Sequence, residues 1–357
     1  MVKRSSPVKS TLITLLTAAF FVAGCAGKEE PVMQKSTPSF TAESREVSGQ
    51  TVVVLKRSGE HPLEASVTPV AGANLISLVY HGKELLRGPE DLSTFDGSSP
   101  GSPVLYPTPN RVAVGKFSFE GRSFDFGLND GDRFLHGLVR SVPWQYEIPA
   151  ATDTSASVRT WIDFTPGSPL YEKFGFDHRL TLTYTVDKLG LRIGYEVTNH
   201  DSRRLPYGIA FHPYFLFLGS RESAILCVPA QKHHEAVNLM PTGRLEDLEG
   251  TPYDIRTPTP VPDLVLDDVY WGMRPEAPAW IEYREAGIRL ELKASPEFTH
   301  MVVYIQPQNA FFCVENQTCS TDAHNFFARG LVDEAHLLFA EPGGTSSGWV
   351  HYAISPL

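Results

Sequence analysis

The chain has 357 residues, of which 42% are hydrophobic and 20% are charged, so a sizeable folded core is expected and wholesale disorder is excluded. Asp and Glu residues (41) outnumber Lys and Arg residues (31). This net charge of −10 argues against a nucleic-acid partner, whose phosphates need an excess of basic groups. Four cysteines without a CxxC pair do not make a disulfide scaffold or a zinc framework.

The first 24 residues have the layout of a secretory signal peptide. Residues 1–10 carry basic side chains and no acid, and residues 11–24 are almost wholly apolar. As a helix, this apolar stretch would span about 21 Å, which is short of the hydrocarbon core of a membrane. We therefore predict that residues 1–24 are an export signal and take no part in the fold.

The end of this segment, Val22-Ala23-Gly24-Cys25, resembles the bacterial lipobox, in which the cysteine thiol is lipidated and the chain is cut before it. The resemblance implies a membrane-anchored mature protein with 28 basic and 41 acidic residues, a net charge of −13. Because Ala26 rather than an acidic residue follows, the expected location is the periplasmic face of the outer membrane. A plain signal peptide with a coincidental cysteine is the alternative. The polar residues 25–45 are predicted to form a flexible tether.

The remaining chain reads as β-structure from end to end. Residues 178–186 and 191–198 each alternate apolar and polar side chains across a short turn, which predicts an antiparallel hairpin with one buried face. A shorter hairpin is predicted for residues 117–126. Further strands are expected at Thr51–Lys56, Leu75–Tyr80, Val158–Phe164, Ile288–Lys293, Met301–Gln306 and Trp349–Ile354. With no amphipathic helical run evident, residues 46–357 are predicted to be a single, mainly β domain, a large antiparallel β-sandwich.

Two segments lack this alternation. Asp96–Asn110 and Gln231–Asp263 are rich in proline, glycine and acidic residues, so we expect long loops there. Long loops on a rigid sandwich are common places for functional sites.

Five polar positions interrupt apolar or aromatic stretches. They are Asn110-Arg111, His136-Gly137, His212, Asp267-Asp268 and Glu315. Burial beside aromatics raises the pKa of a carboxylate and lowers that of a histidine, which brings both toward neutrality and suits general acid–base chemistry. Taken singly, each residue has a plainer interpretation, as a strand-end charge, a core histidine, a loop cap or a turn former. Without further comparison, these residues indicate a β protein, and an acid–base site is one of several interpretations of its polar positions.

The order of the motifs along the chain resembles that of the aldose 1-epimerase (galactose mutarotase) family. The motifs are Asn110-Arg111, Gly115-x5-Gly121, His136-Gly137, Thr198-Asn199, His212-x-Tyr214-Phe215, Asp267, Glu315-x-Gln317 and Asp322-Ala323-x-Asn325. The resemblance covers roughly residues 65–355 and implies a large antiparallel β-sandwich that interconverts the α and β anomers of a free hexose. It also implies a monosaccharide substrate, and the implied reaction requires no cofactor and no metal.

The resemblance also assigns roles by position. Glu315 matches the general base that takes the proton from the anomeric hydroxyl, and His212 matches the acid that protonates the ring oxygen. The residues expected to bind the sugar are Arg111, His136, Asp267, Asn110 and Arg140. Asp268 stands where many relatives have histidine, so Asp267 is the better match.

Some residues depart from the pattern of the galactose-type members. Arg140 resembles the branch that epimerises hexose 6-phosphates, so a hexose-6-phosphate 1-epimerase is one alternative, although an exported protein would rarely meet such a substrate. A non-catalytic carbohydrate-binding lipoprotein is another. Cys313 and Cys319 flank Glu315 and form either a disulfide or two unpaired thiols. The sequence leaves the hexose, the anomer preference and the oligomeric state open.

Overall fold

The computed structural model describes residue 1 and residues 39–357. The predicted signal peptide, Cys25 and most of the predicted tether lie outside the described residues, and their assignment stays a prediction. Within the described part of the chain, no helix is long and apolar enough to cross a membrane.

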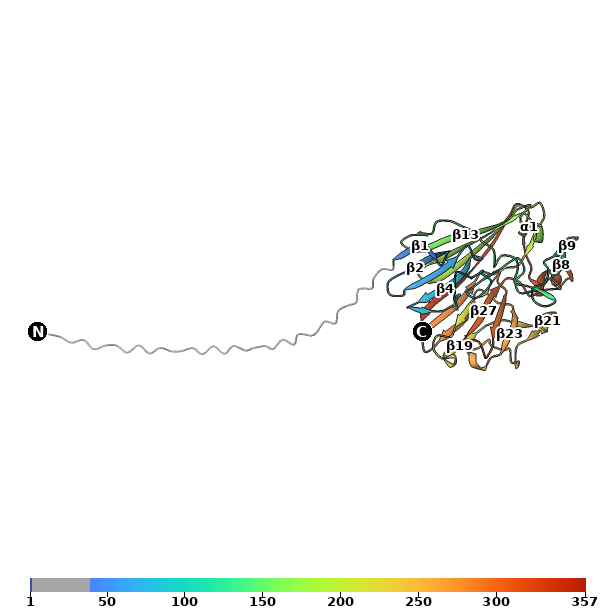
Figure 1. The fold of residues 1–357 in the computed structure, drawn as a ribbon. Coiled ribbons are helices and arrows are strands. Elements are labelled where there is room, and N and C mark those ends of the chain that lie inside the picture. The colour runs from blue at the N-terminus through green and yellow to red at the C-terminus, as the bar shows by residue number, and fades with distance from the viewer. Residues whose placement is uncertain (2–38) are drawn as a thin grey trace. The chain divides into compact units, whose positions relative to one another are not determined.

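Three antiparallel sheets build the folded domain (Figure 1). The first has five strands in the order β1 (Phe40–Val47), β2 (Gln50–Arg57), β3 (Leu63–Thr68), β4 (Asn74–Tyr80) and β5 (Lys83–Glu84). The second has ten strands: β11 (Gln145–Tyr146), β13 (Ala156–Phe164), β14 (His178–Val186), β15 (Gly190–Asn199), β29 (Thr345–Pro356), β25 (Ile288–Ala294), β24 (Ala279–Tyr283), β19 (Ala224–Cys227) and β22 (Thr259–Pro260) in order, with β12 (Ala150–Ala151) beside β13.

The third sheet has eight strands and carries most of the candidate site. Its order is β21 (Met240–Asp247), β20 (Lys232–Val237), β23 (Leu266–Trp271), β26 (His300–Ile305), β27 (Phe311–Gln317), β17 (Ala210–Phe211) and β6 (Val104–Leu105), with β18 (Tyr214–Leu216) also paired to β27. The isolated bridge between Leu86 and Phe215 links this sheet to the five-stranded one.

Smaller elements complete the domain. Three two-stranded pairs are β7 (Arg111–Ala113) with β10 (Arg133–Leu135), β8 (Lys116–Phe119) with β9 (Arg122–Asp125), and β16 (Leu205–Tyr207) with β28 (Leu338–Ala340). The α-helices in the described residues are α1 (Pro169–Phe174), α2 (Ala323–Ala328) and α3 (Val332–Ala335), and the 3-10 turns are η1 (Arg221–Ser223) and η2 (Val261–Asp263). The short helices agree with the lack of a long amphipathic run in the sequence.

The core lies between the sheets because alternate side chains of each strand point inward. The hairpin β14–β15 buries its apolar face as predicted, with Leu182 and Tyr195 each at most 1% exposed. Phe215 of the eight-stranded sheet meets Tyr352 of the ten-stranded sheet, with ring centroids 6.1 Å apart. Strand β2 of the five-stranded sheet contacts β13 and β14, beside which it lies in Figure 1. The predicted antiparallel β-sandwich is confirmed.

Two expectations about local structure were wrong. Residues 40–45, predicted as part of the tether, belong to strand β1, where Phe40 is buried and pairs with Arg57 of β2. The predicted loop Gln231–Asp263 contains strands β20 and β21, which form a hairpin at the edge of the eight-stranded sheet. Polar edge strands bury little apolar surface, so their sequences lack the alternation that marks the core strands.

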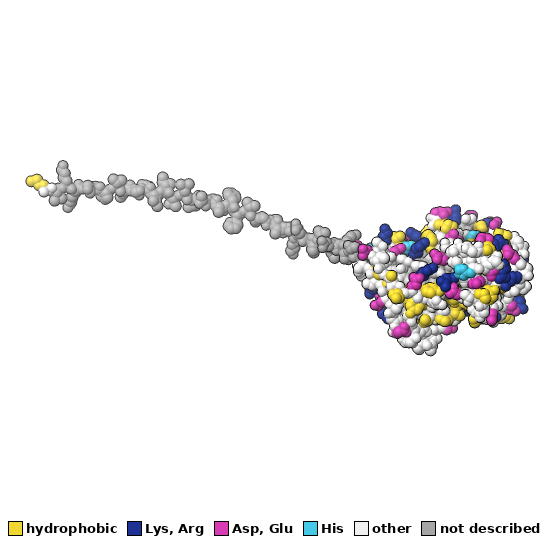
Figure 2. Space-filling view, turned by 90° about the horizontal axis from the view of Figure 1, so that it is seen from above, with side chains coloured by type: hydrophobic (Ala, Val, Ile, Leu, Met, Phe, Trp, Pro, Cys, Tyr) yellow, Lys and Arg dark blue, Asp and Glu magenta, His cyan; other side chains and the backbone are white. Residues whose placement is uncertain are grey.

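The surface carries both signs of charge. On the face shown in Figure 2, Lys and Arg side chains lie among Asp and Glu side chains, with apolar side chains between them. Several of these charges pair across strands, for example Arg179 with Asp163 at 2.7 Å. Such mixed surfaces favour solubility over the binding of polyanions.

Candidate active site

A cavity of about 190 Å³ brings together six of the seven residues predicted to bind or transform the ligand. Its lining residues are Asn110, Arg111, His136, His212, Tyr214, Asp267, Val302, Tyr304, Phe311 and Glu315. This volume lies below the roughly 300–1,000 Å³ of pockets for drug-sized molecules, so the cavity suits one small polar ligand.

The eight-stranded sheet forms the floor of this cavity. Phe311 and Glu315 lie on one face of β27 because side chains alternate along a strand. Tyr304 lies on the neighbouring strand β26, opposite the position between them, and so shares that face. Asp267 lies on β23, next to β26. His212 lies in the break between β17 and β18, both of which pair with β27. Residues far apart in the sequence are thus fixed by ladder hydrogen bonds.

The β7–β10 pair forms one wall and has an unusual backbone. Asn110 and His136, at neighbouring ends of the pair, have φ values of 57° and 70°, a left-handed conformation that is uncommon for residues other than glycine. The His136 backbone N–H donates to the Asn110 carbonyl at 2.9 Å, which joins the two turns. Gly137 is required beside them, since a Cβ there would lie 2.3 Å from the Tyr106 carbonyl oxygen.

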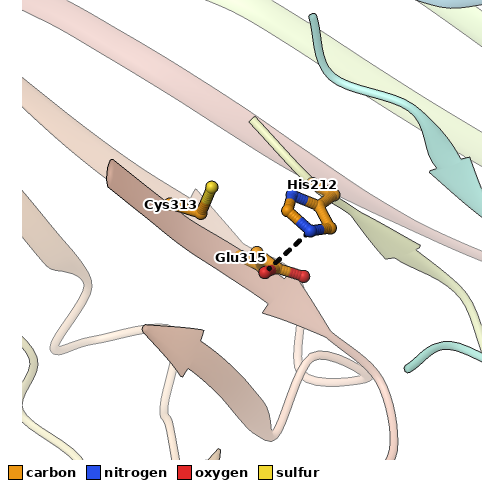
Figure 3. A group of neighbouring side chains, drawn as sticks. All are labelled: His212, Cys313 and Glu315. Atoms are coloured by element: carbon orange, nitrogen blue, oxygen red, sulfur yellow. Dashed lines mark ion pairs between the residues drawn. The ribbon is translucent and has the colours of Figure 1, made fainter. Parts of the chain in front are cut away.

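His212 and Glu315 form a buried pair at the centre of the site. His212 Nε2 lies 3.4 Å from Glu315 Oε1, and their side chains are only 9% and 3% exposed (Figure 3). Gln317, two residues along β27, donates from Nε2 to the other carboxylate oxygen of Glu315 at 3.2 Å. The Tyr214 ring stacks on the His212 ring with centroids 4.7 Å apart. These contacts hold the two groups within proton-transfer reach of one small ligand.

Burial shifts the protonation of this pair. Loss of water contact raises the pKa of Glu315 well above its usual range, and nearby Asp267 raises it further, while Gln317 and Arg111 oppose the shift. Loss of water contact also lowers the pKa of His212 to about 4. The pKa of the neighbouring His136 is well below its usual value, first through burial and then through the charge of His212. Such opposed shifts at one site are typical of general acid–base chemistry.

Arg111 and Asp267 place charged hydrogen-bonding groups on the wall. Asp130 accepts from Arg111 Nε at 2.9 Å and Asn110 Oδ1 accepts from Arg111 Nη1 at 3.2 Å. These bonds fix the guanidinium, whose five N–H groups still offer further donors to a ligand. Burial raises the pKa of Asp267. Asp268 instead interacts with His233 Nε2 at 2.9 Å and is not among the lining residues. The structure therefore places Asp267, rather than Asp268, at the cavity, as expected from the sequence.

Arg140 is the predicted site residue that does not line the cavity. It is half-buried, and its guanidinium donates to the Ser98 carbonyl at 3.4 Å. The sequence motifs include Tyr214 beside His212, but they do not include the lining side chains Tyr304 and Phe311. Strand alternation could have indicated Phe311, because it lies four residues before Glu315 and therefore on the same face of β27.

The described cysteines are all unpaired and buried. The disulfide between Cys313 and Cys319 that the sequence left open is therefore not formed. Cys313 lies between Phe311 and Glu315 on β27 and points to the same side as Glu315 (Figure 3). Together with His212 and Glu315, it forms the cluster of metal-ligand types found among the described residues.

A second hollow is larger, with about 790 Å³ between the β8–β9 hairpin and helix α2. Two of its lining charges, Lys116 and Asp125, are exposed and pair with each other at 3.1 Å. A third, Asp322, is buried, and its carboxylate accepts from the Ala113 backbone N–H at 3.0 Å and from Asn325 Nδ2 at 2.7 Å. Exposed, paired charges are poor acids and bases, and the Asp322 carboxylate is occupied by these structural hydrogen bonds. The smaller cavity, where His212 and Glu315 lie 3.4 Å apart, is therefore the better candidate for chemistry.

A family model described as "Aldose 1-epimerase" matches residues 58–336, which is more than three quarters of the chain. The chain belongs to the aldose 1-epimerase family. Among curated proteins, it is similar to the galactose mutarotase of Sus scrofa, with 28% identity over 158 residues, 42% of this chain and 43% of that protein. It is also similar to protein YihR of Escherichia coli (strain K12), with 27% identity over 182 residues, 50% of this chain and 54% of YihR. The matched regions thus span about half the length of these relatives.

Solved structures share the fold of this aldose 1-epimerase family member. A galactose mutarotase-like protein from Clostridium acetobutylicum aligns with a TM-score of 0.80 and 20% identity over 89% of this chain and 99% of its own. A putative aldose 1-epimerase from Escherichia coli K12 aligns with a TM-score of 0.68 and 18% identity over 89% and 100% of the two chains. At these identities, the likeness shows a common fold.

Proposed function

We propose that this protein is an aldose 1-epimerase that interconverts the α and β anomers of a free hexose. The observation that carries the proposal is the buried His212–Glu315 pair, 3.4 Å apart, at a small cavity with hydroxyl-binding groups on its wall. Arg111 offers donors and Asp267 offers acceptors to the sugar hydroxyls. Tyr214, Tyr304 and Phe311 offer aromatic surface to the sugar ring.

The reaction needs one proton removed and one proton supplied. Glu315 takes the proton of the anomeric hydroxyl, the C1–O1 bond becomes a carbonyl, and the bond between C1 and the ring oxygen breaks. His212 gives its proton to the leaving ring oxygen. The C1–C2 bond of the open aldehyde rotates, the hydroxyl adds to the other face of C1, and both protons return along the same path. Because the same two groups must run the reaction in both directions, the acid and the base need similar proton affinities.

The charges of the wall favour a neutral sugar over a hexose 6-phosphate. Asp267 and Glu315 are carboxylates on the wall, and the single guanidinium, Arg111, is already paired with Asp130. A phosphate would bring further negative charge to this site. Arg140, the residue that suggested the phosphate branch, is not among the lining residues and donates to the Ser98 carbonyl, although its charge still acts on His136 and His212.

The substrate is tested by following exchange between the anomeric protons of α- and β-glucose, galactose and their 6-phosphates by NMR. We expect the purified protein to accelerate exchange of a free hexose and to leave the 6-phosphates at their spontaneous rate. Acceleration of a 6-phosphate alone would favour the hexose-6-phosphate epimerase. Sugar binding without acceleration of any anomer pair would favour the non-catalytic binding protein.

We also propose that the protein is exported and anchored through a lipid on Cys25, an inference that rests on the sequence pattern of residues 1–25. Cells that produce the protein with labelled fatty acid should yield a labelled product in the membrane fraction. A Cys25→Ala variant should lose the label and the membrane association. Equal membrane association of both variants, without label in either, would contradict the anchor.

A further inference from the structure

Three potential metal ligands of different chemistry converge beside the cavity. Cys313 and Glu315 are two residues apart on β27 and project from the same face, and His212 lies opposite them (Figure 3). The Sγ atom, one imidazole nitrogen and one carboxylate oxygen all lie within 4.8 Å of one another. All three residues are buried, with exposed fractions of 7% or less.

The spacing of these atoms is close to that of a tetrahedral zinc site. Bond lengths of about 2.0–2.3 Å put neighbouring ligand atoms of such a site roughly 3.3–3.6 Å apart. His212 Nε2 and Glu315 Oε1 already lie 3.4 Å apart. The sulfur atom lies within 4.8 Å of one imidazole nitrogen and one carboxylate oxygen, so a shift of about 1 Å or less would bring it to the distance of a zinc ligand.

The donor set selects the type of ion. One sulfur, one nitrogen and one oxygen suit borderline-soft ions such as Zn²⁺ and Co²⁺. Mg²⁺ and Ca²⁺ prefer six or more oxygen ligands, which this buried cluster does not offer. Gln317 holds the second oxygen of Glu315 at 3.2 Å, so the first is left for the ion and the carboxylate is oriented.

The fourth ligand position faces the cavity. His212 and Glu315 both line the cavity, so an ion bound between them would be open to water on that side. Three protein ligands with one open position are typical of exposed zinc sites rather than closed structural ones. On binding, the Cys313 thiol gives its proton to solvent as the metal–sulfur bond forms.

We propose that Zn²⁺ binds reversibly to Cys313, His212 and Glu315 and inhibits the protein. The inhibition rests on the proposed function, because the ion occupies both the base and the acid of the reaction and excludes the sugar from them. Cys313 takes no part in the proton transfers, yet it completes the metal site. The binding and the chemistry can therefore be separated by changing this one residue.

The first test measures mutarotation of the purified protein against buffered Zn²⁺. We expect Zn²⁺ to suppress the activity in competition with sugar, EDTA to restore it, and Mg²⁺ to have no effect. Cys313→Ala should keep the activity without metal and need roughly tenfold more Zn²⁺ or more for the same inhibition. Cys313→Ser serves as a second variant should alanine impair folding. Cys319→Ala, which removes another buried thiol outside the cluster, should behave as the unchanged protein.

The second test does not depend on activity. Co²⁺ bound by a thiolate gives a sulfur-to-metal charge-transfer band in the near ultraviolet, and we expect this band in the unchanged protein and in Cys319→Ala but not in Cys313→Ala. Its absence from the unchanged protein, equal Zn²⁺ inhibition of Cys313→Ala, or stimulation by Zn²⁺ would overturn the proposal. A Cys313-dependent band in a protein inactive on every sugar would sustain the metal site and contradict the proposed function instead.

Discussion

At the residue scale, the environments of His212 and Glu315 decide how protons are held in the site. Burial alone favours a neutral imidazole and a protonated carboxyl group, and Arg111 opposes this by lowering the pKa of Glu315. Because the two groups lie 3.4 Å apart, they titrate as a unit whose macroscopic pKa values belong to the pair. The singly protonated pair has one group ready to accept a proton and one ready to donate it.

This coupling predicts a bell-shaped dependence of kcat/KM on pH, with activity lost when the pair holds two protons or none. Replacing Arg111 by Met removes a positive charge that lowers the pKa of Glu315, so the acid limb should move to higher pH. The measurement is the pH profile of both proteins with a free hexose. An acid limb that stays in place or moves to lower pH would contradict this electrostatic role of Arg111.

The residues of the proposed catalytic pair, and most of the other residues that line the cavity with them, could be predicted from motif order because the proposed chemistry requires specific side chains. Asn110 and His136 were found in this way, although their left-handed backbone could not be. Tyr304 and Phe311 were missed because they contribute only surface, which many strand residues could supply. Arg140 is not among the residues that line the cavity, although its charge acts on His136 and His212, so its expected role in binding stays a prediction.

At the scale of elements, the site depends on how short strands end. The turn after β10 passes so close to Tyr106 that only a glycine at position 137 fits, and this turn carries His136 into the cavity. The β8–β9 turn offers a contrast, since Gly121 has a similar positive φ but no atom within 4 Å of a Cβ built there.

We expect Gly137→Ala to lower the free energy of unfolding by more than Gly121→Ala does. Both variants carry the left-handed strain of about 1–2 kcal/mol, but at Gly137 the new Cβ would also lie 2.3 Å from the Tyr106 carbonyl oxygen. The excess should be about 1 kcal/mol or more, measured by urea denaturation. Equal losses in the two variants would show that the Tyr106 backbone yields freely.

Strands with one buried face were predictable because burial imposes alternation, as in β14 and β15. Strand β1 and the β20–β21 hairpin were missed for two reasons. Strands β1 and β21 are edge strands that expose much of both faces, and β20 buries the polar rings of His233 and His234 rather than apolar side chains. The tip of that hairpin has positive φ values at Asn238 and Leu239, and leucine gives little warning of such a turn.

At the scale of the whole molecule, buried histidines couple stability to pH. Burial is the largest cause that lowers the pKa of His178 to about 3 and of His234 and His324 to about 4. His300 is buried in the same way, and its pKa is well below the usual value. In the unfolded chain, the pKa of each of these histidines is about 6.5. Above that pH, both states keep the rings neutral; below it, only the unfolded chain gains protons.

The free energy of unfolding should therefore fall as the pH drops from about 6.5 toward 4. Each such histidine contributes about 1.4 kcal/mol per pH unit over this window, so several together rival a typical total stability. Urea denaturation at a series of pH values measures the slope. The His178→Phe variant should show a slope that is smaller by the contribution of about one proton. A flat profile between pH 6.5 and 4 would contradict the account.

The central claim is that Glu315 acts as the base on a bound sugar, and polarimetry of freshly dissolved α-glucose and α-galactose tests it most directly. We predict that the unchanged protein accelerates the drift in optical rotation, while Glu315→Gln loses roughly 10²–10⁴-fold in rate and still binds sugar by calorimetry. Glu276→Gln, a surface control whose side chain is 69% exposed, should keep full activity. Undiminished acceleration by Glu315→Gln would contradict the account.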